Sequence, residues 1–125
     1  MTALRFIAPE VPLYAQELEL RFKVLREPLG HTRADVKFPF EAESLHLVAL
    51  DGDAVVGCVL FHPQSPTGGR LFQMAVAPER QGTGLGARLV KALEAELVQR
   101  GFTEVVLHAR AQVTGFYERL GYAAF

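Results

Sequence analysis

The stretch that decides this fold is Gln81-Gly82-Thr83-Gly84-Leu85-Gly86-Ala87, which joins a predicted strand to the strongest predicted helix of the chain. Its glycines allow the backbone to turn tightly and to approach a ligand closely. The first amides of the following helix have no intrahelical acceptor, and they point outward together at the positive end of the helix dipole. Because such an arrangement binds phosphate without a lysine, the sequence predicts a phosphate or pyrophosphate site here.

Two other glycine-rich motifs fit this loop less well. A P-loop ends in Lys followed by Ser or Thr, where this chain has Ala87-Arg88, so that motif is excluded. Gly82, Gly84 and Ala87 do match a dinucleotide fingerprint. That fingerprint, however, follows its strand almost at once in a parallel sheet, whereas in this chain an antiparallel meander precedes the loop. His108 also stands where the fingerprint expects an acid for the ribose. A dinucleotide enzyme that binds NAD(P)H is therefore the disfavoured interpretation.

Hydrophobic periodicity places further elements around the loop. Leucines at positions 85, 89, 93 and 97 line one face of a helix over Gly84–Arg100. The other predicted elements are strands at Leu4–Ile7, Leu45–Leu50, Ala54–Phe61, Arg70–Ala77, Glu104–His108 and Tyr122–Phe125, and helices from Pro12 to Leu25 and from Val113 to Leu120. Three consecutive strands form an antiparallel meander, and the strand-helix-strand step after them implies a parallel pair. We expect an α/β (α+β) fold with a mixed, mostly antiparallel sheet and helices on both faces.

Composition narrows the class of protein. The 125 residues fit one domain, 1–125, and the net charge of −1 does not favour a nucleic-acid or membrane partner. The single cysteine, Cys58, excludes an internal disulfide, and the four histidines lack metal-ligand spacing, so no metal is expected. No apolar run approaches the roughly 18 residues of a membrane span, and residues 1–12 do not resemble a secretion signal. The expected location is cytoplasmic.

The residues that flank the loop resemble the GNAT N-acetyltransferase family. Gln81 to Gly86 match its Gln/Arg-x-x-Gly-x-Gly/Ala signature, and Val76-Ala77-Pro78 resembles its V-x-P lead-in. Tyr117-Glu118-Arg119-Leu120-Gly121-Tyr122 resembles its Tyr-Glu-x-x-Gly-Phe ending, so the likeness covers residues 70–122. Two further likenesses are to the family's first hairpin, at His46–Ala49 with Val56-Gly57, and to a small bacterial subgroup related to ElaA, at Arg21–Pro28.

This resemblance implies a GNAT-like acyl-CoA N-acyltransferase fold with shortened C-terminal strands and a parallel pair of strands at the cofactor site. It implies an enzyme that moves the acetyl group of acetyl-CoA to a primary amine of a small molecule or peptide, by direct attack in a ternary complex. Backbone groups of Met74, Ala75 and Val76 would pair with the pantetheine arm, and Tyr117 would be the general acid for the departing thiolate. The amides that would hold the pyrophosphate belong to Gln81, Gly82, Thr83, Gly84, Leu85, Gly86 and Ala87. Arg110 stands where the family usually has Asn, so one customary pantetheine contact is missing from the pattern.

The general base is left open by the sequence. His46, His108, Glu41 and Glu43 are candidates by residue type alone, and Gln73 stands where a carboxylate would have helped.

Each singled-out residue also has a structural interpretation. His46 alternates with apolar neighbours, so it lies either in a substrate cleft or on the solvated face of the sheet. Tyr117 lies on the apolar face of its helix, where a core tyrosine is the alternative. Cys58 is expected to be a small buried hydrophobe rather than a nucleophile. Arg80 either assists a phosphate of the coenzyme or is a solvated charge.

The acceptor is not specified by the sequence. The first helix and the loop Gly30–Ala42 would form much of the acceptor side, and their charge is mixed. The last strand has barely begun at Phe125, which leaves a sheet edge that a second copy would cover and so favours a homodimer. The alternative function is a non-catalytic acyl-CoA-binding or regulatory module, which the short C-terminal end and the unassigned base would suit.

Overall fold

The computed structural model describes residues 2–107 and 114–123. The strands are β1 (Thr2–Ile7), β2 (Leu45–Asp51), β3 (Ala54–Pro63), β4 (Gly68–Val76) and β5 (Glu104–Val106). The helices are α1 (Pro12–Arg21), α2 (Leu85–Gln99) and α3 (Thr114–Arg119), with shorter turns at η1 (Phe22–Arg26), η2 (Glu27–Leu29), η3 (Arg33–Asp35) and η4 (Pro78–Arg80). Within these ranges, no helix has the length and apolar character that crossing a membrane requires.

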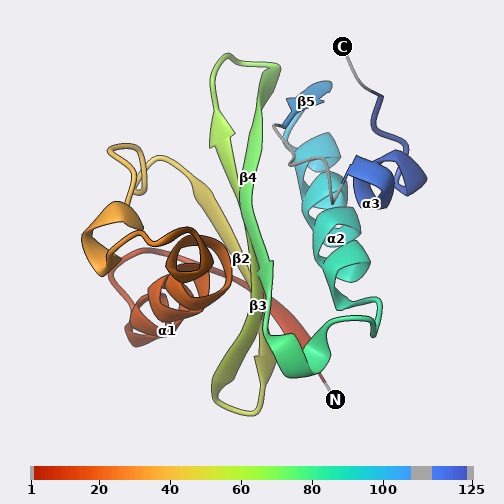
Figure 1. The fold of residues 1–125 in the computed structure, drawn as a ribbon. Helices are drawn as coiled ribbons and strands as arrows, with labels where there is room; N and C mark the ends of the chain where they lie inside the picture. Colours follow the sequence, from red (N-terminus) through yellow and green to blue (C-terminus); the bar gives the residue numbers. More distant parts are fainter. Residues whose placement is uncertain (1, 108–113, 124–125) are drawn as a thin grey trace.

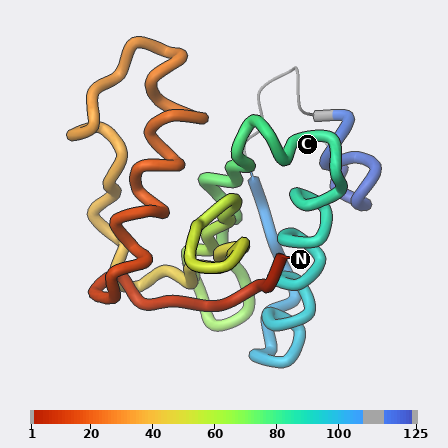
Figure 2. Tube along the Cα trace, turned by 90° about the horizontal axis from the view of Figure 1, so that it is seen from below, coloured from red at the N-terminus to blue at the C-terminus, as the bar shows by residue number. Residues whose placement is uncertain are grey.

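One five-stranded sheet, in the order β1-β2-β3-β4-β5, lies at the centre of the molecule. The first four strands pair antiparallel, and β4 pairs with β5 in parallel. α1 lies against one face of the sheet, and α2 and α3 lie against the other (Figures 1 and 2). The predicted mixed sheet with helices on both faces and a parallel pair after the meander is therefore confirmed.

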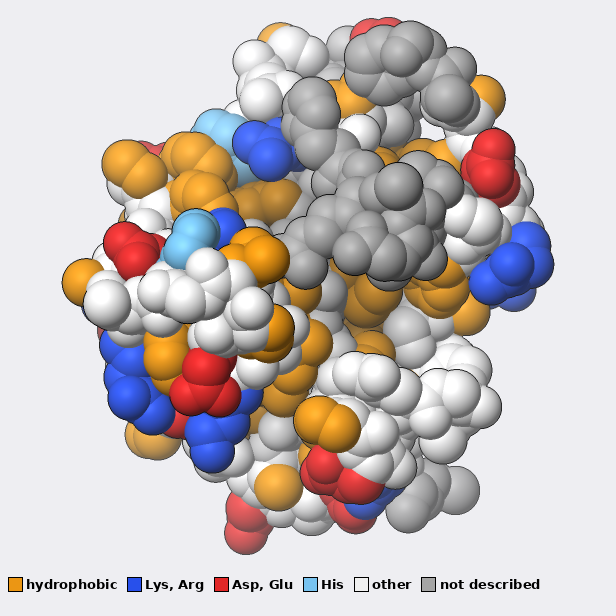
Figure 3. All heavy atoms as spheres, viewed as in Figure 1, with side chains coloured by type: hydrophobic (Ala, Val, Ile, Leu, Met, Phe, Trp, Pro, Cys, Tyr) orange, Lys and Arg blue, Asp and Glu red, His pale blue; other side chains and the backbone are white. Residues whose placement is uncertain are grey.

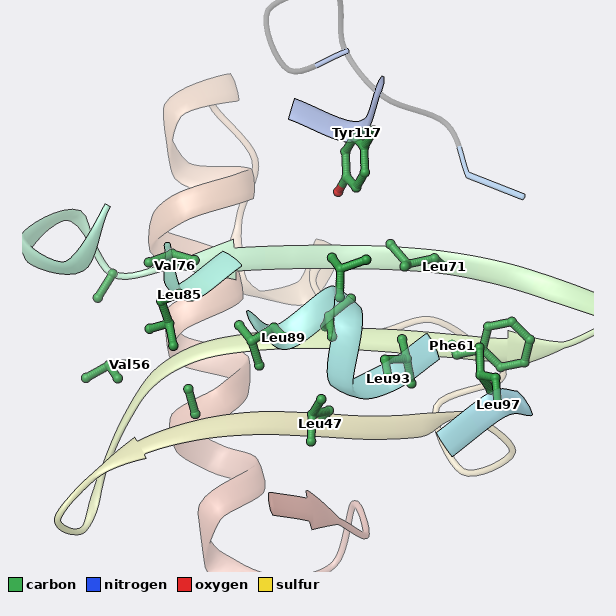
Figure 4. Close-up of a cluster of buried hydrophobic side chains, with 14 residues drawn as sticks. Leu47, Val56, Phe61, Leu71, Val76, Leu85, Leu89, Leu93, Leu97 and Tyr117 are labelled. Carbon is green, nitrogen blue, oxygen red and sulfur yellow. The ribbon is translucent and has the colours of Figure 1, made fainter. Parts of the chain in front are cut away.

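The strands bury a hydrophobic cluster on each face, because alternate side chains of a strand point to opposite sides. Toward α2, the four leucines of the helix stripe pack on Leu47 of β2, Phe61 of β3 and Leu71 of β4 (Figure 4). Toward α1, the cluster includes Val48, Cys58, Leu60, Phe72 and Ala75. The stripe of α2 is thus a core face, as its periodicity predicted.

The first helix is shorter than its sequence pattern predicted. α1 ends at Arg21, and the chain continues as the π-helical turn η1, in which the amide of Glu27 donates to the carbonyl of Phe22. Pro28 lacks an amide proton, so the helix cannot continue regularly beyond it. Gly30, with φ of 78°, then ends the segment.

The predicted strand from Tyr122 to Phe125 is absent where it can be checked. Tyr122 and Ala123 are not in a strand, and residues 124 and 125 lie outside the described part of the chain. The amide of Tyr122 donates to the carbonyl of Tyr117, and its hydroxyl donates to Glu94 of α2 at 2.7 Å. These bonds tie Tyr122 to the helical layer rather than to the sheet. The homodimer expected from an incomplete strand stays a prediction.

Candidate functional site

β4 and β5 form a short parallel fork. They pair only through Gly68 with Glu104, Gly69 with Val105 and Arg70 with Val106. Beyond this pairing β4 continues to Val76, and no strand of the described residues pairs with that side of it. Backbone N–H and C=O groups along such an edge are available to an extended ligand. Met74, Ala75 and Val76, the predicted pantetheine contacts, lie on this open edge.

A β-bulge interrupts β4 in the middle of the open edge. Cys58 pairs with Ala75 and Leu60 pairs with Phe72, so Gln73 and Met74 together stand opposite a single residue of β3. Gln73 has φ of 52°, a left-handed conformation that costs a non-glycine residue roughly 1–2 kcal/mol. Such strained positions cluster at functional sites. Sequence reasoning noted only the side chain of Gln73 and missed the bulge, because Gln carries no turn signal.

The glycine loop follows the open edge after the short turn η4. Gly82 and Gly84 have φ of 81° and 83°, and no atom lies within 4 Å of the position that a Cβ would take at either residue. Gly84 is the N-cap of α2, so the amides of Leu85, Gly86 and Ala87 have no acceptor within the helix. Their open, positively polarised surroundings are those of an anion site. The loop thus has the geometry that the sequence predicted.

Two contacts hold the loop against the fork. The side-chain amide of Gln81 donates to the carbonyl of Val76 at 3.0 Å. A Cβ on Gly86 would lie 3.3 Å from Cζ of Phe116 and 3.6 Å from Sδ of Met74, so glycine lets α2 approach both β4 and α3. The open edge of β4, the glycine loop and α3 therefore pack together as one unit.

Tyr117 projects from α3 toward the sheet, with its hydroxyl on the side of β4 (Figure 4). Its ring belongs to the α2-side hydrophobic cluster and packs edge-on against Phe116 and Tyr122. Burial raises the pKa of Tyr117 to about 12, so the hydroxyl keeps its proton at physiological pH. The residue is both part of the core and a protonated donor beside the fork, so the two interpretations of Tyr117 are compatible.

The cations that flank the loop are already engaged. Arg80 forms an ion pair with Asp51 at the end of β2, and Arg88 donates to the hydroxyl of Thr2 at 2.9 Å. The Arg80 side chain is partly exposed, so its interpretation as a solvated charge and its role toward a phosphate both stay predictions. Phosphate binding at this loop would rest first on backbone amides.

Two of the candidate bases, His46 and Glu41, lie in a buried polar network under α1, away from the glycine loop. The network consists of Tyr14, Glu17, Arg21, Glu41 and His46. His46 is completely buried, so its placement in a cleft or on a solvated face was wrong. Its Nδ1 lies 2.9 Å from Glu17, and its Nε2 donates to the carbonyl of Glu41 at 2.8 Å. Neither residue is free to take a proton from an acceptor.

Arg21 holds the charges of this network in place. Its guanidinium donates to Glu17 at 2.8 Å and to Glu41 at 2.7 Å and 2.9 Å. Side-chain oxygens of Glu17 and Glu41 and a ring nitrogen of His46 lie within 4.8 Å of one another, a spacing compatible with a metal. Arg21 and a protonated His46 together balance the charges of the two carboxylates, so the network is complete as an ion cluster.

The structure describes two of the four remaining residues that the sequence singled out. Glu43 is exposed, while His108 and Arg110 lie outside the described residues. Cys58 is fully buried, and burial raises the pKa of its thiol, which confirms the small buried hydrophobe.

The buried network predicts the pH dependence of stability. Burial alone would raise the pKa of Glu41, but hydrogen bonds from Arg21, the Phe38 amide and Tyr14 outweigh it and lower the pKa to about 2 from 4.5. Burial would lower the pKa of His46, but its hydrogen bond with Glu17 outweighs burial and the pKa is raised from 6.5. Glu41 therefore stabilises the fold above pH 4.5, and this contribution is lost as the pH falls toward about 2. The contribution of His46 is complete below pH 6.5 and is lost as the pH rises through its raised pKa.

We expect the free energy of unfolding from urea titrations to be greatest between these limits and to fall by up to about 3 kcal/mol toward pH 2. A free energy that stays level between pH 5 and pH 3 would contradict this account of Glu41.

Comparison with known proteins places the fold and the loop in one family. The sequence profile of the Acetyltransferase (GNAT) family matches residues 13–122. An uncharacterized acetyltransferase of Streptococcus pyogenes serotype M1 is 28% identical over 85 residues, which are 68% of this chain and 60% of that protein. The matched stretch thus spans less than two thirds of that relative.

Two solved structures share the fold. Escherichia coli ElaA aligns with a TM-score of 0.82 and 18% identity, covering 97% of this chain and 86% of ElaA. An aminoglycoside 6'-N-acetyltransferase complexed with coenzyme A aligns with a TM-score of 0.78 and 23% identity, covering 95% of this chain and 83% of that chain. With most of its length matched by the family profile, the chain belongs to the GNAT family of acetyltransferases.

Proposed function

We propose that residues 1–125 form one N-acetyltransferase domain, which moves the acetyl group of acetyl-CoA to a primary amine of a small molecule or peptide in a ternary complex. One observation carries the proposal. The open edge of β4 is followed, after the short turn η4, by a glycine loop at the N-terminus of α2, so an extended amide-bearing arm and a pyrophosphate have adjacent places.

The coenzyme would occupy both places at once. Its pantetheine arm would add to the edge at Met74, Ala75 and Val76 as a short strand does, through backbone hydrogen bonds. The pyrophosphate would lie on the amides of Gln81 to Ala87. A structural neighbour with the same fold is complexed with coenzyme A, which supports this use of the fork.

The transfer itself needs few side chains. The amine nitrogen attacks the thioester carbon, the C–N bond forms and the C–S bond breaks. Backbone amides beside the bulge at Gln73 would stabilise the oxyanion, and Tyr117 would give its proton to the departing thiolate. The ammonium proton leaves to solvent or to a base that the described residues do not identify. Much of the rate would come from holding the two reactants together.

Calorimetric titration with acetyl-CoA, with NADH as a parallel control, tests the coenzyme assignment. Binding of acetyl-CoA alone, followed by amine-dependent release of CoA thiol, is the expected result. Tight binding without release under any amine would instead indicate the alternative, a non-catalytic acyl-CoA-binding or regulatory module. Binding of NADH alone would instead favour the interpretation of the chain as a dinucleotide enzyme.

Tyr117→Phe is expected to lower kcat by about 10- to 100-fold with acetyl-CoA affinity within about twofold of the wild type, because only the proton donor is lost. Thiol-release kinetics and calorimetry measure the two quantities. Tyr122→Phe is the matched control, since it removes a neighbouring half-buried hydroxyl that bonds to Glu94. A Tyr117→Phe rate equal to wild type from pH 6 to pH 10 would remove Tyr117 from the acid role.

The aminoglycoside acceptor belongs to the structural neighbour, and the charges of this chain do not single it out. Among the described residues of the α1 side, Arg21 and Arg33 are paired with Glu41 and Glu19. The exposed Glu27 and Glu43 form no ion pair with any described residue, so the charge of this side is mixed.

A further inference from the structure

An aromatic cluster covers the α1 side of the fork. We call Phe38, Phe40, His62 and Phe72 the aromatic wall. Phe40 stacks on the ring of His62 with centroids 4.1 Å apart, and it lies 5.3 Å from both Phe38 and Phe72. Phe38 and Phe40 come from the loop between η3 and β2, whereas His62 and Phe72 come from β3 and β4. Since Phe38, Phe40 and His62 are only half-buried, the wall offers ring surface to a ligand.

Unpaired polar atoms concentrate around this wall. Five buried side-chain nitrogen or oxygen atoms of the described residues lack a hydrogen-bond partner, and four of them belong to the wall or its neighbours: Arg26 Nε, His62 Nδ1, Arg70 Nε and Gln73 Oε1. Buried polar groups are normally paired, and leaving one unpaired is unfavourable. Contacts tie three of these residues to the wall: Arg26 lies over Phe38, His62 stacks on Phe40, and Arg70 pairs across the strands with His62. Three unpaired polar atoms around one cluster indicate a missing polar partner.

Two arginines border the wall. The guanidinium of Arg26 lies 5.6 Å from the centre of the Phe38 ring. Arg70 is the cross-strand partner of His62, and directly paired residues of antiparallel strands point to the same face. No ion pair to either guanidinium occurs among the residues that the structure describes. Both cations are therefore available to an anion.

The position of the wall fits the acceptor rather than the coenzyme. Arg70 is the last residue of β4 that pairs with β5, so it stands where the fork opens. Phe72 and Gln73 follow two and three residues later, beside the proposed place of the thioester. In Figure 3 hydrophobic side chains gather along the middle of this face, with basic, acidic and histidine side chains beside them on the α1 side. An acceptor on the wall would thus meet the end of the coenzyme arm.

We infer that the aromatic wall binds the acceptor amine, and that this acceptor carries a flat apolar body and a carboxylate. The body would stack on Phe40 and His62, and the carboxylate would accept hydrogen bonds from Arg70 or Arg26, whose planar forks suit carboxylate geometry. Two acids of this part of the chain are engaged elsewhere, since Glu41 pairs with Arg21 and Asp35 accepts from Thr32. Glu27 and Glu43 are exposed to solvent. This inference rests on the proposed acetyl transfer for its reaction but not for its binding surface.

Matched acceptor pairs test the inference. L-phenylalanine is compared with 2-phenylethylamine, and 4-(aminomethyl)benzoate with benzylamine, so that each pair differs only by the carboxylate. Each compound is titrated by calorimetry into the full chain saturated with CoA, and its acetylation is followed by thiol release. We expect the carboxylate member of at least one pair to bind at least about tenfold more tightly and to have the larger kcat/KM.

The variant Arg70→Gln should reduce that preference about tenfold, whereas Arg100→Gln, the same change at an exposed site on the other end of the α2 helix, should leave it intact. No preference in either pair, or no binding of any of the four compounds to the CoA-saturated protein, would overturn the inference. Preferential binding without turnover would support the surface and contradict the catalytic proposal. Absence of CoA binding itself would contradict the proposed function, and calorimetry of the compounds with the unloaded protein would then decide the surface alone.

Discussion

Gly84→Asp is expected to weaken acetyl-CoA binding by about a thousandfold. Gly84 is the N-cap of α2 with φ of 83°, and the space where a side chain would project is open. A carboxylate there would occupy the proposed pyrophosphate position. Two like charges about 4 Å apart repel by about 4 kcal/mol at the effective dielectric of a protein surface, which corresponds to about a thousandfold in affinity.

The control for this variant is Gly101→Asp. Gly101 also has a positive φ, of 88°, and open space at its Cβ position, but it lies beyond the other end of α2. Both variants carry the same conformational cost of about 1–2 kcal/mol and the same added charge, so thermal unfolding should shift similarly. Calorimetry should show lost acetyl-CoA binding only for Gly84→Asp. If Gly84→Asp bound acetyl-CoA with an affinity within tenfold of the wild type, the proposal that the pyrophosphate binds at this loop would be wrong.

The glycine loop was predictable because its signal is local. Gly82 and Gly84 adopt left-handed conformations that other residues avoid, and the leucine stripe that follows records one buried helix face directly. The three-stranded meander was equally readable, since Asp51-Gly52-Asp53 marks its first turn.

Features that depend on distant partners were not predictable from local pattern. His46 has the alternation of a residue on an open face, yet Glu17, 29 positions earlier, meets it in the interior. The start of the predicted final strand was wrong, because Tyr122 bonds to Glu94, 28 positions away, and neither Tyr122 nor Ala123 is in a strand. The aromatic wall joins Phe40 to His62 and Phe72 across a loop that shows no regular periodicity. In each case tertiary contact overrides what the local sequence favours.

Arg21→Met is expected to lower the free energy of unfolding by about 3–5 kcal/mol, because it leaves buried carboxylates without their cation. The Arg21 side chain is completely buried, and it also donates to the carbonyl of Val36 at 2.8 Å. Such a loss is a large part of the 5–15 kcal/mol that stabilises a typical domain. Arg33→Met is the matched control. Its pair with Glu19 is exposed on both sides, so the expected loss is at most about 1 kcal/mol. Urea titration of both variants at pH 7 measures the difference.

The pH dependence of the Arg21→Met deficit separates lost charge pairing from lost packing. In the wild type the pKa of Glu41 is lowered to about 2, so acid removes stability. Without the guanidinium, burial dominates and the pKa of Glu41 rises above its unfolded value, so the variant loses stability as the pH rises and regains it as the carboxyl is protonated. The two stability curves should therefore converge from pH 7 toward pH 4. A deficit that is the same at both pH values would mean that Arg21 stabilises the fold through the volume of its side chain. A deficit from lost charge pairing would instead change as the carboxylates are protonated.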